Sequence, residues 1–238
     1  MNTNMQQILD HYIEKFSYIN NTENDENYKW IVAKEFRILM DDALSKEGEV
    51  FVGALDKARL ATKNMIDNYT QPFYGLVEFA KQEPETVKQM FLDLLYTEDH
   101  GDLHVQEKLI DKFFKKSNEL LQKYAPDSYR YKQNSHSVSA YLFLYNPEQH
   151  YMFKATQAAI FADCIGFYDD WGTGDNIRLN VFYRMCDMLV DAISQDQRLL
   201  EINELRYCGE FRTKKERLRI KGVMQGIKFV LILKHNIG

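Results

Sequence analysis

The sequence predicts a mainly α-helical protein, a multi-helix globular domain with a short basic C-terminal extension. Among 238 residues there are only 4 Pro and 11 Gly, too few for a turn-rich sandwich, and 45% are hydrophobic, enough for a sizeable core. Apolar residues also recur three and four positions apart along most of the chain, as on one face of a helix. We therefore expect one helical domain over residues 1–207 and a basic extension over 208–238.

The first third of the chain predicts three helices. The first covers 5–19 and ends at the polar run 20–27, and the second covers 28–44. Two glycines then punctuate the chain before a third helical pattern, which follows Leu55, Leu60 and Met65.

The next stretch predicts three more helices with clear boundaries. The turn 68–72 precedes a short helix over 73–81. Pro84, flanked by two glutamates, marks the next helix start, because proline suits the first helical position and carboxylates suit the positive end of the helix dipole. This helix runs to about residue 96, and the acidic turn 97–102 separates it from a long helix over 103–124.

The segment 129–171 is unusually aromatic, with eleven Phe, Tyr or Trp residues. It is expected to form a helix over 137–145 with one apolar side, a turn, a short aromatic stretch and a second helix that Gly166 ends. Most of the aromatic side chains then belong to the core. The side chains expected to remain partly exposed are Tyr151, Lys154, Tyr168 and Trp171.

The C-terminal part changes in both charge and periodicity. Helical spacing continues over 175–194 and 196–207, whereas residues 217–221 alternate basic and apolar side chains, as a half-exposed strand does. Residues 206–238 hold nine Lys or Arg and two Glu, a net charge of +7 within a chain total of −5. An acidic body with a basic end limits any nucleic-acid contact to a local surface.

Most catalytic signatures are absent from the sequence. There is no G-x-x-x-x-G-K-[ST] nucleotide loop, no G-x-S-x-G elbow, no Glu-x-x-His pair, and no acidic residue two positions before a lysine. These absences disfavour P-loop ATPases, serine hydrolases, helical di-iron proteins and small metal-dependent nucleases. The chain is therefore expected to be non-enzymatic and to need no cofactor or metal.

One cluster, residues 99–104, has the composition of a metal site. Its two histidines are four apart, which would place them on one helical face, but Gly101 interrupts a helix there. We expect a solvated turn in which Asp102 caps the helix that follows. The other four histidines are isolated in the sequence.

Cysteine content and hydropathy indicate a soluble cytoplasmic protein. Cys164, Cys186 and Cys208 are too few and too far apart for a disulfide framework or zinc site, so buried free thiols are expected. No signal-peptide pattern opens the chain, and the longest late apolar run has five residues, far short of the ~20 of a membrane span.

Two sets of residues have the composition of nucleic-acid contacts. The basic segment consists of Arg212, Lys214, Lys215, Arg217, Arg219 and Lys221, which either contact phosphates or form a solvated edge strand that their charges protect from aggregation. The second set consists of Arg130, Tyr131 and Lys132, together with Tyr151 and Lys154. These side chains either stack on bases and pair with phosphates or form a loop with tyrosines that keep their hydroxyls in water.

Three segments, 78–95, 119–124 and 137–167, resemble the helical N-terminal region of McrB-like AAA-type restriction ATPases, which act on modified DNA. In that family a run like SxYLFxxxPExYYxYK stands in the place of residues 139–154, and the resemblance extends over roughly 28–207. Longer members continue into an ATPase that partners a separate nuclease subunit, whereas this sequence contains no ATPase motif.

The resemblance implies a targeting or regulatory domain of a phage-defence restriction system. We therefore expect a non-catalytic DNA-recognition or specificity module. The alternative is an assembly domain that docks an ATPase or nuclease subunit without touching DNA. The resemblance assigns no residue a catalytic or base-reading role.

Overall fold

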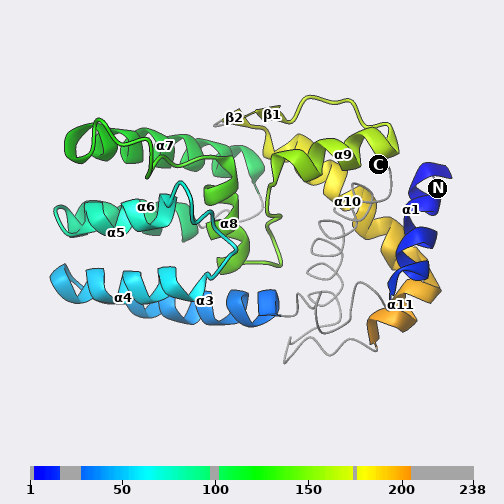
Figure 1. Cartoon of the computed structure of the whole chain (residues 1–238), viewed down its shortest axis with the longest axis horizontal. Coiled ribbons are helices and arrows are strands. Elements are labelled where there is room, and N and C mark those ends of the chain that lie inside the picture. The colour runs from blue at the N-terminus through cyan, green and yellow to red at the C-terminus, as the bar shows by residue number, and fades with distance from the viewer. Residues whose placement is uncertain (1–2, 17–27, 97–101, 174–175, 205–238) are drawn as a thin grey trace. The chain divides into compact units, whose positions relative to one another are not determined.

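The computed structural model describes residues 3–16, 28–96, 102–173 and 176–204, which form ten α-helices and one two-stranded β-hairpin (Figure 1). The predicted mainly helical class is thus confirmed. The basic extension 208–238 and its expected strand lie outside the described residues. The described helices form two compact units.

The first unit contains the described residues up to Trp30, Phe153–Trp171, and those from Asn180 onward. Its elements are α1 (Thr3–Glu14), α9 (Ala155–Ile165), most of α10 (Leu179–Gln195) and α11 (Gln197–Glu204). Helix α1 packs against α9 and α11, and Arg198 at the start of α11 donates to Asp10 of α1 at 2.7 Å. Gly166, in the left-handed conformation with φ 69°, ends α9 as the sequence predicts.

The second unit contains Ile31–Met152 and Gly172–Leu179. In Figure 1 its helices α3 to α7 run alongside one another, and α8 crosses them. The elements are α3 (Tyr28–Leu44), α4 (Gly48–Ala61), α5 (Pro72–Ala80), α6 (Pro84–Leu95), α7 (Leu103–Tyr124), α8 (Ser135–Tyr145), β1 (Gly172–Thr173) and β2 (Asn176–Ile177). The strands pair antiparallel, with Gly172 opposite Ile177.

Helix α8 is the most completely buried helix of this unit. The four residues of its predicted apolar side, Val138, Tyr141, Leu142 and Tyr145, are all buried as expected, and nearly all its other residues are buried too. Its Tyr141 contacts aromatic rings from three other helices, with centroids 5.1–6.1 Å apart: Phe73 of α5, Phe91 of α6 and Phe113 of α7. The aromatic residues of 137–145 are therefore core.

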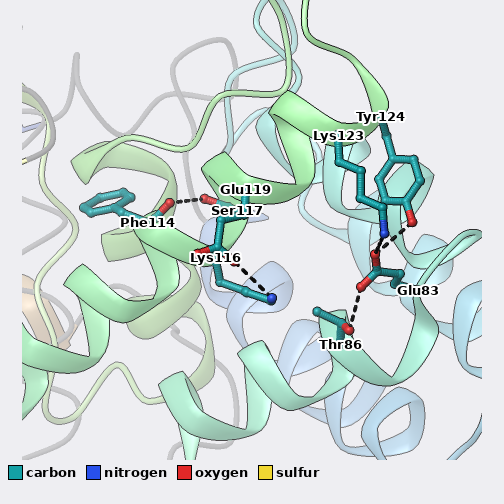
Figure 2. A network of polar contacts seen from close by, with 8 residues as sticks. All are labelled: Glu83, Thr86, Phe114, Lys116, Ser117, Glu119, Lys123 and Tyr124. Carbon is teal, nitrogen blue, oxygen red and sulfur yellow. Dashed lines mark hydrogen bonds and ion pairs between the residues drawn. The ribbon is translucent and has the colours of Figure 1, made fainter.

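Helices α6 and α7 are joined at one end by Glu83 (Figure 2). The Glu83 carboxylate accepts hydrogen bonds from the Lys123 ammonium at 2.7 Å, the Tyr124 hydroxyl at 2.8 Å and the Thr86 hydroxyl at 2.9 Å. These three donors, the Lys123 bond first, lower the Glu83 pKa from 4.5 to about 2. The network fastens the end of α7 to the start of α6.

The predicted cap at the start of α7 is confirmed. The Asp102 carboxylate accepts from the backbone N–H groups of His104 and Val105. Residues 97–101 lie outside the described part, and among the described residues no three His, Cys, Asp or Glu side chains gather as a metal site.

The described cysteines are free but not fully buried. Cys164 and Cys186 are both half-buried, so the expectation of buried thiols was too strong, and Cys208 lies outside the described residues. Partial burial, with the nearby Asp163 carboxylate, raises the pKa of the Cys164 thiol. Among the described helices, none has the length and apolar character needed to cross a membrane.

Candidate nucleic-acid interface

The loop that leads from α7 to α8 is anchored to α5 by Tyr131. The Tyr131 backbone N–H donates to the Thr70 carbonyl at 2.7 Å, and its ring lies 5.9 Å from the Tyr74 ring and 6.2 Å from the Phe79 ring. Gly75 makes this approach possible, because a Cβ atom there would lie 2.3 Å from the Tyr131 Cβ. The Tyr131 ring thus packs on α5 and serves as the anchor of the loop, whereas the sequence placed it among the base-stacking residues.

A buried glutamine holds the same loop from its other end. Gln133 is 1% exposed and donates to the Pro72 carbonyl at 2.7 Å and the Tyr131 carbonyl at 3.2 Å. Its side-chain oxygen accepts from the Ser137 hydroxyl at 3.2 Å and the Tyr141 hydroxyl at 3.0 Å. The loop, the start of α5 and the core helix α8 therefore share one buried amide.

Two tyrosine rings near the Tyr131 and Gln133 anchors are exposed to solvent. Tyr129 is 66% exposed and Tyr69 is 71% exposed, although their ring centroids are only 6.2 Å apart and inclined by 45°. Tyr69 comes from the turn between α4 and α5, and Tyr129 from the loop after α7. Two exposed aromatic rings from distant parts of the sequence thus form one surface.

Arg130 lies beside this pair. Its guanidinium carbon lies 5.2 Å from the centroid of the Tyr129 ring, its Nε donates to the Tyr129 hydroxyl at 2.9 Å, and its Nη1 makes a long contact of 3.5 Å with the Gln71 side-chain oxygen. Within the described part of the chain Arg130 forms no ion pair with a carboxylate. We call Tyr69, Tyr129 and Arg130 the tyrosine–arginine surface.

The turn that carries Tyr69 is held by Asp67. The Asp67 carboxylate accepts from the backbone N–H of Tyr69 at 2.8 Å, from the backbone N–H of Thr70 at 3.0 Å and from the Thr70 hydroxyl. Partial burial opposes ionisation of Asp67, but these hydrogen bonds outweigh it and lower the pKa of the carboxyl group. The Asp67 carboxylate therefore stabilises its own turn through these hydrogen bonds.

A polar hollow of about 390 Å³ lies next to the tyrosine–arginine surface. It is formed by the end of α4, the turn that carries Tyr69 and the start of α5. Among its lining residues are Arg59, Lys63, Asn68 and Gln71, and Gln71 joins the hollow to Arg130. Its volume is in the range of small-ligand sites. Arg59 is compensated by Asp56 at 2.6 Å, whereas the exposed Lys63 forms no ion pair within the described residues.

Backbone strain concentrates around this hollow. Among the described residues other than glycine, those with positive φ are Lys63 at 49°, Gln71 at 50° and Tyr131 at 74°. The first two line the hollow and the third anchors the loop beside it. A left-handed backbone conformation costs a non-glycine residue about 1–3 kcal/mol, and such residues cluster at functional sites. Their presence here supports the region around the hollow as a candidate functional site.

The other predicted contact residues have different outcomes. Tyr151 is 1% exposed, so the expectation of an exposed ring is wrong: the turn after α8 returns its aromatic residues to the core. Lys154 is half-buried, immediately precedes α9 and belongs to the first unit. Lys132 is exposed and adjoins Tyr131, and the basic segment Arg212–Lys221 lies outside the described residues.

The remaining two residues are at least partly exposed, as predicted. Tyr168 is 80% exposed as predicted. Trp171 is half-buried and stacks on Phe167, with centroids 6.3 Å apart.

Tyr69, Lys63 and Gln71 were missed by sequence reasoning. Tyr69 lies in the turn predicted at 68–72, where no apolar residues recur at helical spacing. An aromatic residue in such a turn indicates an exposed ring, and this signal could have identified it. Its nearness to Tyr129 depends on a contact across 60 positions, which no local pattern contains.

A second concave region lies between α6 and α7, with a volume of about 570 Å³. Met90, Leu109 and Phe113 supply its apolar part. Its charged residues are Lys112, Lys115, Lys116 and Glu119 of α7 and Glu85 and Asp93 of α6, and Lys116 pairs with Glu119 at 3.1 Å. Lys112 and Asp93 pair across it at 2.5 Å.

Comparisons with family models, with curated proteins and with solved structures found no match to this chain.

Proposed function

We propose that this chain is a non-catalytic nucleic-acid-recognition module that uses the tyrosine–arginine surface for contact. The observation that carries the proposal is the pairing of two exposed tyrosine rings with an arginine that has no described acidic partner. Aromatic rings stack on bases, and guanidinium groups pair with phosphates and stack on rings. Hydrophobic packing alone gives no reason for two adjacent rings to stay in solvent.

We place this module in the cytoplasm, in an McrB-like restriction system that defends against phage. Support for that setting comes from the resemblance of residues 28–207 to the N-terminal region of such ATPases. The basic segment Arg212–Lys221 adds a second, sequence-independent contact to phosphates in this proposal.

Fluorescence anisotropy with labelled DNA, modified and unmodified, at two salt concentrations tests the proposal. Arg130→Gln should weaken binding about three- to tenfold and lower the salt slope by about one, because one phosphate contact is lost. Lys115→Gln is the matched control, since Lys115 is an exposed cation of the same unit on α7. Absence of binding at low salt, or equal losses in the two variants, would overturn the proposal.

A second candidate function is assembly, in which the α6–α7 groove docks a partner subunit. The observation that favours it is an apolar floor beside the exposed Lys115, which forms no ion pair within the described residues, whereas Lys112 and Lys116 are paired with Asp93 and Glu119. This arrangement suits an amphipathic helix whose apolar face covers the floor and which places an acidic residue beside Lys115. The partner in this reading is an AAA-type ATPase or nuclease subunit.

Charge reversal separates the two functions. Lys115→Glu should abolish capture of a purified AAA-type ATPase or nuclease subunit if the groove is a docking site, and should leave DNA affinity unchanged. Arg130→Gln and the triple variant of Lys214, Lys215 and Arg217 should do the reverse. If the Lys115→Glu variant still captures the partner subunit, the α6–α7 groove is not the docking site.

A further inference from the structure

We infer that the tyrosine–arginine surface binds unpaired bases of a single strand in preference to duplex. This inference rests on the proposed function and specifies its substrate class. It follows from which part of a nucleic acid the two rings can contact.

Tyr69 and Tyr129 are both largely exposed, so their rings are the groups that a ligand can contact. Stacking requires the flat face of a base, and in a duplex those faces are covered by the neighbouring base pairs. Duplex readers instead insert a helix or ribbon into a groove and hydrogen-bond to base edges. Here the exposed groups are rings on a turn and a loop, which suits faces more than edges.

The spacing of the rings fixes how bases can lie on them. A base between two rings needs about 7 Å, twice the van der Waals separation of carbon atoms. The centroids of Tyr69 and Tyr129 are 6.2 Å apart and the rings are inclined by 45°, so no base fits between them. Bases therefore stack on the outer parts of the pair, which accommodates about two neighbouring nucleotides.

The cations lie where the strand's backbone would run. Arg130 covers part of Tyr129 and reaches Gln71 at the edge of the polar hollow, and Lys63 lines that hollow. Stacking rings with cations and amides nearby are typical of single-strand binders that tolerate many sequences. The hollow thus supplies phosphate and sugar contacts next to the stacked bases.

The surface is also held in place before any ligand arrives. Asp67 fixes the turn of Tyr69, while Tyr131 and Gln133 fix the loop of Tyr129. Binding then costs little ordering of backbone, which favours affinity from a small contact area.

The test uses the full chain and four labelled probes of the same length: single-stranded DNA, its RNA equivalent, the DNA duplex, and a single strand that lacks bases. Tighter binding of either unmodified single strand than of the duplex is expected, with a loss of about a hundredfold for the abasic strand, since stacking contributes about 1–3 kcal/mol for each of two bases. Tyr69→Leu and Tyr129→Leu should each weaken single-strand binding by about tenfold.

Tyr168→Leu is the matched control, because this tyrosine is 80% exposed and is not one of the three residues that define the tyrosine–arginine surface. It should leave all affinities unchanged. If no probe binds at low salt, the proposed function fails together with the inference. If the duplex or the abasic strand binds as tightly as the intact single strand, and Arg130→Gln still weakens that binding, the inference alone is overturned.

Discussion

Tyr131 lies so close to Gly75 that a methyl group at position 75 would overlap its Cβ atom, at 2.3 Å. This contact joins the loop after α7 to α5 and leaves Tyr129 and Arg130 projecting from a fixed base. Positioning of the candidate surface thus depends on a glycine that itself offers no group to a ligand.

Gly75→Ala should therefore both destabilise the protein and weaken nucleic-acid binding. The clash involves the Cβ and backbone of Tyr131, not a flexible side-chain end, so we expect a loss of about 1–3 kcal/mol in the free energy of unfolding. Denaturant unfolding measures the first effect and anisotropy the second.

Gly53→Ala is the control for that experiment. Gly53 is exposed in α4, and an added Cβ would meet nothing within 4 Å. This variant should stabilise the protein by about 0.5–1 kcal/mol, because alanine is more stable than glycine inside a helix. Equal behaviour of the two alanine variants would refute the role of the Gly75 contact.

Removing the buried amide of Gln133 should be among the more costly single changes. Gln133→Leu leaves the Pro72 carbonyl and the Tyr141 hydroxyl without this partner in a region closed to water, so we expect a loss of about 3 kcal/mol. Tyr141→Phe removes one hydroxyl and should cost only about 1 kcal/mol. Urea denaturation measures the free energy of unfolding of both variants. If both lose only about 1 kcal/mol, water replaces the Gln133 amide as the hydrogen-bond partner.

The Glu83 network should give acid sensitivity over a defined pH range. The Glu83 pKa is about 2 in the folded chain against an ordinary value of 4.5, so the ionised carboxylate stabilises the fold above about pH 4.5. This contribution declines as the pH falls from about 4.5 towards 2.

Glu83→Gln should accordingly lower the melting temperature at neutral pH, and its difference from the wild type should shrink towards pH 2. Glu85→Gln, an exposed carboxylate one residue beyond Pro84, is the control and should change little at any pH. Calorimetry at several pH values measures both. A deficit for Glu83→Gln that stays constant with pH contradicts the assigned role of its charge.

A tyrosine that resists ionisation is expected at Tyr145. Its hydroxyl and that of Tyr96 both donate to the same Asp41 oxygen at 2.6 Å. Burial, reinforced by the Asp41 carboxylate, raises the pKa of Tyr145. Since its folded pKa lies above the ordinary value of 10, the stabilisation is present below that pH and is lost as the pH rises towards the folded pKa.

Spectrophotometric titration checks the behaviour of Tyr145. In the wild type some tyrosines should ionise only as the chain unfolds at alkaline pH. Tyr145→Phe should remove one of them. An unchanged late step in that variant would show that Tyr145 ionises while the chain is folded.

Local patterns predicted the helices well because local forces set them. The bounds 28–44 and 103–124 match α3 and α7, where apolar spacing coincides with clear end signals such as the Asp102 cap. The hairpin of β1 and β2 was not predicted, since strands of two residues carry no readable alternation.

The candidate surface was only partly predictable. Arg130 follows from the aromatic and basic alternation of its loop, but Tyr131 in the same pattern faces α5 because Gly75 leaves room for it. Burial of Tyr151 likewise comes from tertiary packing. Sequence spacing assigns residues to faces within one element, whereas these outcomes depend on which elements meet.

Ultraviolet cross-linking of the full chain to single-stranded DNA, followed by mass spectrometry of the peptides, tests the central claim most directly. Cross-links are predicted in the peptides that contain Tyr69 or Tyr129, and they should disappear when these tyrosines are replaced by leucine. Cross-links confined to the basic segment Arg212–Lys221 or to α6 and α7 would contradict the assignment of the tyrosine–arginine surface as the nucleic-acid interface.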